Sequence, residues 1–254
     1  MENKVKYDVT DLTSLEKLEP VRVRPGMYIG STGTKGLHHC IWEILDNSID
    51  EISNGYGNKA SVILNRDKSV TIIDNGRGVP TGVHPIKKKT GVEMVYTELH
   101  TGGKCDNKNY KTSGGLHGVG AAVVNALSER LEVEVHQNGN IYRQRFEYAF
   151  DKEIGKDMPG TAVTPLEIVG KSKDTGTRVT FKPSKEVFST TEFKFDIIDE
   201  RLKELSFQNK GIYLELIDRR KDEEVKKEYY SENGLLDFIK YLNESKTPIH
   251  QNPI

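Results

Sequence analysis

The chain has 254 residues, of which 35% are hydrophobic and 30% are charged, enough to bury a core without metals or disulfides. Its 37 basic and 38 acidic side chains nearly cancel, which argues against a strong sequence-independent attraction to nucleic acid. No apolar run approaches the roughly 20 residues that span a bilayer, and the first residues lack the apolar core of a signal peptide. The two cysteines, Cys40 and Cys105, fit no zinc pattern, and we expect free thiols in a cytoplasmic protein.

The N-terminal third predicts an arm followed by a long helix. Residues 1–18 are polar and weakly periodic, so we expect an N-terminal arm ahead of a single domain over residues 19–254. A helix is expected over 37–54, with Gly55 as its C-terminal cap. Its core-facing stripe recurs at intervals of three or four residues and consists of Leu37, Ile41, Leu45, Ser48 and Ile52.

The rest of the chain mixes hairpins and helices. Strands are expected over 60–65, 69–74, 131–136, 141–147, 177–182 and 212–217, and helices over 91–100, 118–128, 193–208 and 234–243. Because most strands follow one another as hairpins, this pattern predicts an α+β domain in which helices cover one face of a sheet.

Two glycine clusters indicate a phosphate-binding loop. His100-Thr101-Gly102-Gly103-Lys104 precedes Gly114-Gly115-Leu116-His117-Gly118-Val119-Gly120, which leads directly into a helix-like segment. The backbone N–H groups of such a loop can surround an anionic group. The spacing matches neither the usual phosphate loop nor the dinucleotide fingerprint, so a different kind of nucleotide site is indicated.

Polar side chains gather on the helix over 37–54, opposite its apolar stripe. They are Glu43, Asn47, Asp50 and Glu51. A solvated surface would have the same pattern. Asp74 favours a binding site, because strand alternation puts its carboxylate at the end of a buried face, where it needs a hydrogen-bond donor. The amino group of a nucleotide base would be a suitable donor.

A glycine turn follows this strand. In Asn75-Gly76-Arg77-Gly78-Val79-Pro80 the backbone can approach a flat ligand while Arg77 covers the ligand by stacking. The two glycines could also serve only to make the turn. The order of acidic helix, aspartate strand end, glycine turn and glycine-rich loop favours the functional interpretation.

These segments resemble the nucleotide motifs of a known group of ATPases. Glu43-x-x-Asp46-Asn47-x-x-Asp50-Glu51, the turn after Asp74 and the second glycine cluster resemble motifs shared by gyrase, heat-shock chaperones, histidine kinases and the mismatch-repair protein MutL. Three flanking segments narrow the resemblance to the B-type subunits of bacterial type II topoisomerases, either gyrase B or the ParE subunit of topoisomerase IV. They are Arg24-Pro25-Gly26-Met27-Tyr28-Ile29-Gly30, His100-Thr101-Gly102-Gly103-Lys104 and Lys246-Thr247-Pro248-Ile249-His250. The resemblance implies a two-layer α/β sandwich of the Bergerat (GHKL) type, with helices on one face of a mixed, mostly antiparallel sheet.

The resemblance also implies a site for ATP and Mg²⁺. Glu43 would be the general base that activates the attacking water, and Asn47 would be a Mg²⁺ ligand. We expect Asp50 to have a supporting polar role near the metal or near Asp74.

At the base-binding end, the resemblance implies that Asp74 accepts a hydrogen bond from the adenine amino group, with Thr177 assisting through water. Arg77 would lie over adenine and pair with Glu51, and Pro80 would pack nearby. The remaining nucleotide contacts that it implies are Gly78, Lys104, Tyr110, Gly115, Leu116, His117, Gly118, Val119 and Gly120.

For the full-length protein the resemblance implies a homodimer that closes on ATP binding, with Tyr7 reaching into the partner subunit. It further implies an A-type subunit (GyrA or ParC type) and DNA as partners, and ATP-competitive inhibitors at the adenine pocket. The family continues into a transducer domain whose lysine reaches the γ-phosphate. We therefore expect this chain alone to bind ATP, hydrolyse it slowly and stay mainly monomeric.

Three features depart from the family pattern. Residues 150–171 are longer than the usual connection and are interpreted as an extra surface loop. Gln137 stands where many members have arginine at the pocket rim, and Cys105 replaces a typical aromatic.

Two other classes of protein remain alternatives. One is a histidine kinase core, which lacks the His-Thr-Gly-Gly-Lys segment found here. The other is a structural DNA-clamp or dimerisation module that has lost its nucleotide. Replacement of Glu43 or Asn47 by another residue type would favour this alternative, and both residues are present.

Overall fold

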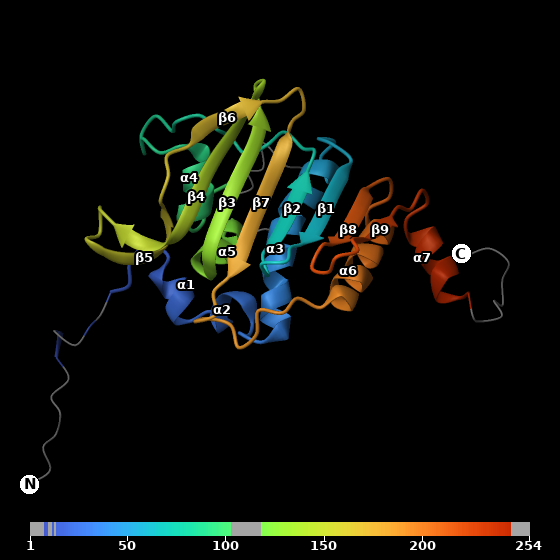
Figure 1. The fold of residues 1–254 in the computed structure, drawn as a ribbon, viewed down its shortest axis with the longest axis horizontal. Helices are drawn as coiled ribbons and strands as arrows, with labels where there is room; N and C mark the ends of the chain where they lie inside the picture. Colours follow the sequence, from blue (N-terminus) through green and yellow to red (C-terminus); the bar gives the residue numbers. More distant parts are fainter. Residues whose placement is uncertain (1–7, 10–11, 13, 103–117, 245–254) are drawn as a thin grey trace, which may run out of the picture.

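The described part of the chain forms one sheet with helices behind it. The computed structural model describes residues 8–9, 12, 14–102 and 118–244. Within these ranges, nine strands form a single sheet in the order β5-β4-β3-β7-β2-β1-β8-β9, and β6 also pairs with β4 (Figure 1). The strands are β1 (Lys59–Leu64), β2 (Val70–Asp74), β3 (Ser128–Gln137), β4 (Asn140–Asp151), β5 (Lys156–Ala162), β6 (Glu167–Lys171), β7 (Gly176–Pro183), β8 (Tyr213–Asp218) and β9 (Val225–Tyr229). The β1–β8 pair is parallel and the other pairs are antiparallel.

Helices cover one face of this sheet. The helices are α1 (Glu19–Val23), α2 (Gly26–Ile29), α3 (Thr34–Ser53), α4 (Gly91–Thr97), α5 (Gly120–Ala126), α6 (Phe195–Gln208) and α7 (Leu235–Leu242). In Figure 1, α3, α5 and α6 lie behind the strands, and the opposite face of the sheet is turned to the viewer. This arrangement confirms the predicted α+β fold class. No helix in the described ranges combines the length and apolar composition needed to cross a bilayer.

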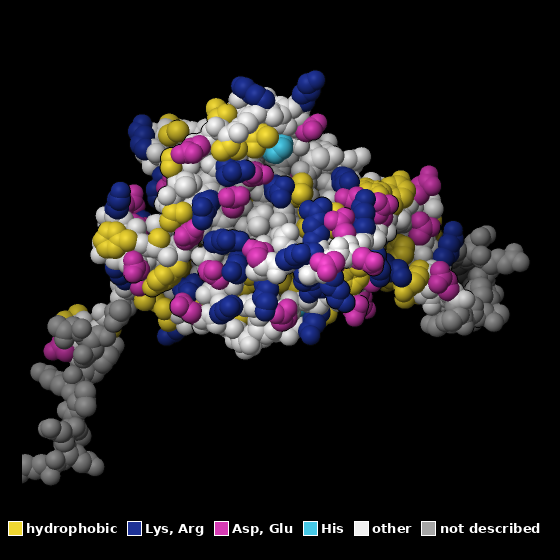
Figure 2. Space-filling model, viewed as in Figure 1, with side chains coloured by type: hydrophobic (Ala, Val, Ile, Leu, Met, Phe, Trp, Pro, Cys, Tyr) yellow, Lys and Arg dark blue, Asp and Glu magenta, His cyan; other side chains and the backbone are white. Residues whose placement is uncertain are grey.

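Side-chain alternation in the central strands explains why only one face is covered. In β3, Leu131, Val133 and Val135 are buried against the helices. Between them, Glu132 and Glu134 point to the other face, as the period of a strand requires. Figure 2 shows that face, on which basic and acidic side chains intermingle. The sheet therefore has one apolar face and one ionic face.

Helix α3 carries the side chains that matter for the site. The predicted core stripe is buried, including Ser48, and the helix begins at Thr34, three residues before the predicted start. Its N-cap, Gly33, is extended, and Ile44 and Ile49 widen the apolar face. Because α3 packs across β1, β2 and β7, its polar side is held next to Asp74, at the end of β2.

The prediction of a surface loop over 150–171 is wrong. These residues contain β5 and β6, which pair in turn with the outer edge of β4. The segment lacks apolar alternation, and β6 has no buried residue, so sequence patterning gave no strand signal. Its strand conformation follows from the unpaired backbone groups that β4 presents at the sheet edge. The short helix α1 and the largely exposed strand β9 were also not predicted.

The two residues just before α1 already pack against the rest of the domain. Leu18 is only 1% exposed, and Lys17 Nζ lies 2.6 Å from Asp151 Oδ2 and 2.8 Å from Glu153 Oε2. These contacts fix the end of the predicted arm to the β4–β5 hairpin. The domain boundary between residues 18 and 19 stays a prediction.

A buried carboxylate joins three strands on the ionic face. Glu215 in β8 accepts a hydrogen bond from Ser61 Oγ at 2.7 Å, and its two oxygens lie 2.8 Å from the ammonium groups of Lys59 and Lys226. Burial by itself would raise the pKa of Glu215, but hydrogen bonds from Lys226, Lys59 and Ser61 outweigh it and lower the pKa to about 2.

We predict that Glu215→Gln destabilises the fold in a pH-dependent way. In the folded chain the pKa of Glu215 is about 2, below its ordinary value of 4.5. The carboxylate therefore stabilises the fold fully above the ordinary pKa and loses this contribution as the pH falls toward 2. Near neutral pH, urea denaturation should show an unfolding free energy lower by about 1–3 kcal/mol. The difference from the unchanged chain should shrink in acid.

Glu129→Gln is the matched control, because the Glu129 side chain is half exposed and its contact with Lys182 spans 3.3 Å. It should change the unfolding free energy by less than about 1 kcal/mol. A destabilisation by Glu215→Gln that stayed constant in acid would contradict the assignment.

Candidate functional site

A cavity of about 670 Å³ opens between α3, the ends of β2, β3 and β7, and the turn after β2. It is lined by most of the predicted site residues that the structure describes. These are Glu43, Asn47, Glu51, Asp74, Arg77, Gly78, Pro80, Gly118, Val119, Gly120 and Thr177. Asp50 does not line it and is buried in α3 at 4% exposure. Tyr7, Lys104, Cys105, Tyr110, Gly115, Leu116 and His117 lie outside the described residues.

Asp74 lies at the floor of the cavity with both carboxylate oxygens engaged. Oδ2 accepts a hydrogen bond from Ser48 Oγ at 2.9 Å. Oδ1 accepts from the backbone N–H of Gly76 at 2.9 Å and of Thr177 at 3.2 Å. Burial raises the pKa of Asp74, and these hydrogen bonds oppose the rise without cancelling it. Each carboxylate oxygen can accept more than one hydrogen bond, so the group keeps capacity for a donor from the cavity.

The backbone around Asp74 leaves no space for side chains. Gly176, with a φ of +149°, would place a Cβ atom 2.1 Å from the carbonyl oxygen of Asp74. The backbone N–H of Thr177 donates to the Asp74 carboxylate directly, and the expected role of Thr177 through water stays a prediction. The tight contact between β7 and the end of β2 thus depends on glycine.

Apolar side chains form the walls above this carboxylate. They are Ile44, Ile72, Val79, Val95 and Val179. A cavity with apolar walls and one buried acceptor at its floor is suited to a flat ring that carries an N–H donor on its edge.

Arg77 is held by one acidic and one aromatic side chain. Its Nε lies 3.0 Å from Glu51 Oε2 and its Nη2 lies 2.8 Å from Glu51 Oε1, a bidentate pair. The guanidinium carbon lies 3.6 Å from the centre of the Tyr56 ring. The Arg77–Glu51 pair was predicted, whereas Tyr56 had no signal in the sequence.

Glu43 lies at the other end of the cavity, beside the start of α5. A Cβ atom at Gly120 would lie 2.0 Å from Glu43 Oε2, so a side chain at this position would displace the Glu43 carboxylate. His39 Nε2 lies 2.9 Å from Glu43 Oε1, and this hydrogen bond raises the pKa of His39. His39 was not identified from the sequence. Its position four residues before Glu43, on the same helix face, was the signal that could have indicated this contact.

Asn47 lies one helical turn after Glu43 and shares its side of α3. Its Nδ2 donates to the backbone carbonyl of Glu43 at 2.9 Å. The amide oxygen is therefore the atom that Asn47 can offer to a cation. Groups of three or more acidic, histidine or cysteine ligands are absent from the described residues.

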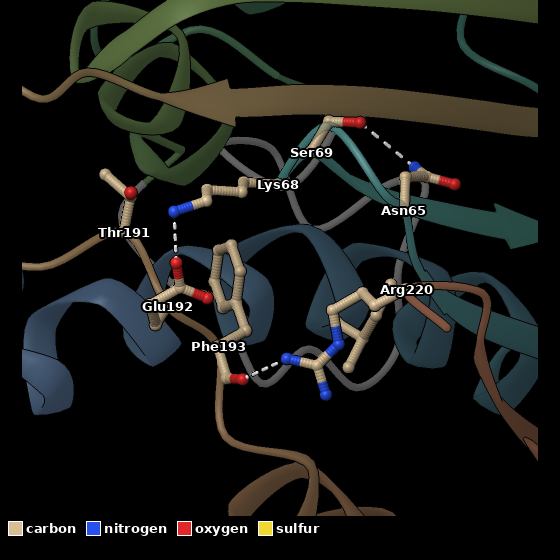
Figure 3. A pocket seen from close by; sticks show the side chains of 8 residues that line it. Asn65, Lys68, Ser69, Thr191, Glu192, Phe193 and Arg220 are labelled. Atoms are coloured by element: carbon tan, nitrogen blue, oxygen red, sulfur yellow. Dashed lines mark hydrogen bonds and ion pairs between the residues drawn. The ribbon is translucent and has the colours of Figure 1, made fainter. Parts of the chain in front are cut away.

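A second hollow lies at the turn between β1 and β2, lined by Lys68, Glu192 and Arg220 among others (Figure 3). Lys68 pairs with Glu192, and Arg220 Nη1 donates to the carbonyl of Phe193 at 2.6 Å. Its volume of about 10 Å³ is close to that of one water molecule, so it is too small for a nucleotide.

Comparison with known proteins adds to this geometry. The B subunit of DNA topoisomerase 4 from Staphylococcus epidermidis is 50% identical over 251 residues, which are 98% of this chain and 36% of that protein. The protein of the same name from Staphylococcus aureus has the same identity and coverage. The chain thus spans about a third of the length of these curated relatives.

A solved structure and a family profile agree with these relatives. The 43K ATPase domain of Thermus thermophilus gyrase B, solved in complex with an aminocoumarin, is 38% identical with a TM-score of 0.78, and the match covers 93% of this chain and 57% of that one. Residues 32–187 match the profile described as "Histidine kinase-, DNA gyrase B-, and HSP90-like ATPase", and the chain belongs to this family of ATPases.

Proposed function

We propose that this chain binds and hydrolyses ATP as the ATPase region of the B-type subunit of a bacterial type II topoisomerase. The observation that carries the proposal is the cavity with Asp74 at one end and Glu43 at the other. The relatives named for topoisomerase 4 and gyrase B support it. In the full-length protein, ATP binding would close a homodimer and drive DNA strand passage together with an A-type subunit, in the cytoplasm.

In this proposal the Asp74 end of the cavity takes adenine. The carboxylate accepts from the adenine amino group, and the apolar walls pack against the ring. Arg77, held by Glu51, covers one side of the base. ATP-competitive inhibitors would occupy the same space. Asp50, which is buried in α3, would act only through its neighbours.

The Glu43 end takes the phosphates and the attacking water. The Glu43 carboxylate accepts a proton from water as the water oxygen attacks the γ-phosphorus, and ADP leaves with the bridging oxygen. His39 holds the Glu43 carboxylate by its hydrogen bond and acts as a positioning residue. The glycine backbone at 118–120, with Lys104, Tyr110, Gly115, Leu116 and His117, would contact the phosphates.

The residues present fit Mg²⁺. Asn47 offers one neutral oxygen, and the described residues hold no dense carboxylate cluster that would favour a protein-enclosed cation. This donor set suits a small hard cation that takes most of its ligands from phosphates and water. When bound, Mg²⁺ would neutralise charge on the phosphates.

We predict that Asp74→Asn or Asp74→Ala weakens ATP binding. Removing a charged acceptor from a buried donor on the ligand should lower affinity by about 10- to 100-fold. Isothermal titration with a non-hydrolysable ATP analogue and Mg²⁺ measures this loss, with thermal unfolding of the unliganded variants as the folding control. Unchanged affinity would count against the adenine assignment.

Glu43→Gln should separate binding from chemistry. We expect analogue affinity to stay within about threefold while ATP turnover falls by about 10²- to 10⁴-fold, because a general base is lost. His39→Gln should lower turnover less, since the Glu43 carboxylate remains. Full turnover in Glu43→Gln would rule out its role as the base.

The topoisomerase assignment is tested with the full-length protein and its cognate A-type subunit. We expect ATP-dependent strand passage, and the assay also distinguishes the two members of the family. Decatenation without supercoiling identifies the topoisomerase IV type, whereas negative supercoiling identifies gyrase. If this chain binds the analogue but the full-length protein does not pass DNA strands, the topoisomerase assignment is wrong and the protein is an ATPase of another class.

A further inference from the structure

The turn after β2 is tied to the body at both of its ends. Near its start, the Arg77 side chain forms the bidentate pair with Glu51. Near its end, Pro80 lies against the start of α4, where a Cβ atom at Gly91 would come within 2.2 Å of the Pro80 carbonyl oxygen. Between them, Gly78 and Val79 line the cavity. The position of this turn therefore sets one wall of the base-binding end.

Gln137, the last residue of β3, bridges the two ends of the turn. Its Nε2 donates to the backbone carbonyl of Arg77 at 3.2 Å. Its Oε1 accepts from Thr81 Oγ1 at 3.1 Å. A backbone carbonyl can only accept, so the Arg77 contact determines which end of the amide is nitrogen.

Glutamine meets both partners with the two ends of one amide. The Arg77 carbonyl requires a donor, whereas the Thr81 hydroxyl can donate or accept. Glutamate could accept from Thr81 but would face the Arg77 carbonyl with a carboxylate. Asparagine is one methylene shorter. The amide is thus fitted to the turn by both of its ends.

The backbone beneath the bridge is also close-packed. Gly78 has a φ of +81°, and a Cβ atom there would lie 2.8 Å from Val135 Cγ1 and 3.2 Å from the carbonyl oxygen of His136. The turn therefore rests directly on the end of β3, and Gln137 extends this contact to Thr81, which does not line the cavity.

We propose that Gln137 is a positioning residue that latches the turn of residues 77–81 onto β3 and thereby holds the wall of the base-binding end. This role rests on the proposed function, because the base that the wall contacts is adenine. Gln137 itself lines the cavity, and in this proposal it acts through the turn, so its loss should change nucleotide affinity and leave the chemistry at Glu43 unchanged.

Gln137→Met keeps the length of the side chain and removes both hydrogen bonds. Each neutral hydrogen bond contributes a factor of about 2 to 10, so affinity for a non-hydrolysable ATP analogue should fall by at least about threefold. The ATP turnover rate at saturation should stay within about twofold. Gln137→Glu should also weaken binding, and it serves if the methionine variant folds poorly.

Thr81→Val distinguishes positioning from direct contact. Because Thr81 lies outside the cavity lining, it should weaken analogue binding only through the latch. In the Gln137→Met background the same change should have no further effect, since the bond is already gone. Arg145→Gln, on the ionic face of β4, is the control and should leave affinity unchanged.

Hydrogen exchange gives a readout that needs no ligand. The amides of residues 77–79, 81 and 82 should exchange faster in Gln137→Met and in Thr81→Val than in the unchanged chain, while those of α3 do not change. Unchanged exchange, or an affinity loss in Gln137→Met with none in Thr81→Val, would overturn the latch. If the unchanged chain fails to bind the analogue while exchange responds as expected, the proposed function fails and the latch stands as a structural contact only.

Discussion

The buried carboxylate of Asp74 is the constraint on which the rest of the site depends. Removing an ionised carboxylate from water is costly unless donors replace the lost hydration. Here the donors come from three separate elements, namely Ser48 on α3, Gly76 in the turn and Thr177 on β7. The hydrogen bonds that stabilise the charge therefore also join the helix layer to the sheet. Burial still raises the pKa of Asp74, so these donors do not fully offset the loss of hydration, and a further donor from the cavity would stabilise the charge.

Glycines allow the backbone to approach both carboxylates of the site. At Gly176 the obstacle to a side chain is the backbone of Asp74 itself, and at Gly120 it is the carboxylate of Glu43. A side chain at position 176 would push β7 away from the end of β2, and a side chain at position 120 would displace the Glu43 carboxylate.

Local patterns predicted the elements that carry the site, and long-range pairing decided the rest. Alternation in β2 was enough to put Asp74 on the buried face, and helical spacing was enough to bury Ser48. That the Ser48 hydroxyl would donate to Asp74 was not visible, because the partners are 26 residues apart. The same holds for Gln137, whose partners lie 56 and 60 residues earlier. Strands β5 and β6 were missed because their conformation depends on the edge of β4 rather than on their own sequence.

The two ends of the cavity are held together by different kinds of contact. At the Asp74 end, bonds between elements far apart in sequence, such as Thr177 to Asp74 across 103 residues, define the shape. At the Glu43 end, the contacts of His39 and Asn47 with Glu43 span a single turn of α3. Local helical contacts keep their geometry whenever the helix is intact, whereas the shape of the Asp74 end depends on how the sheet, the turn and the helix are docked. Changes in docking should therefore alter recognition first and leave the arrangement around Glu43 intact.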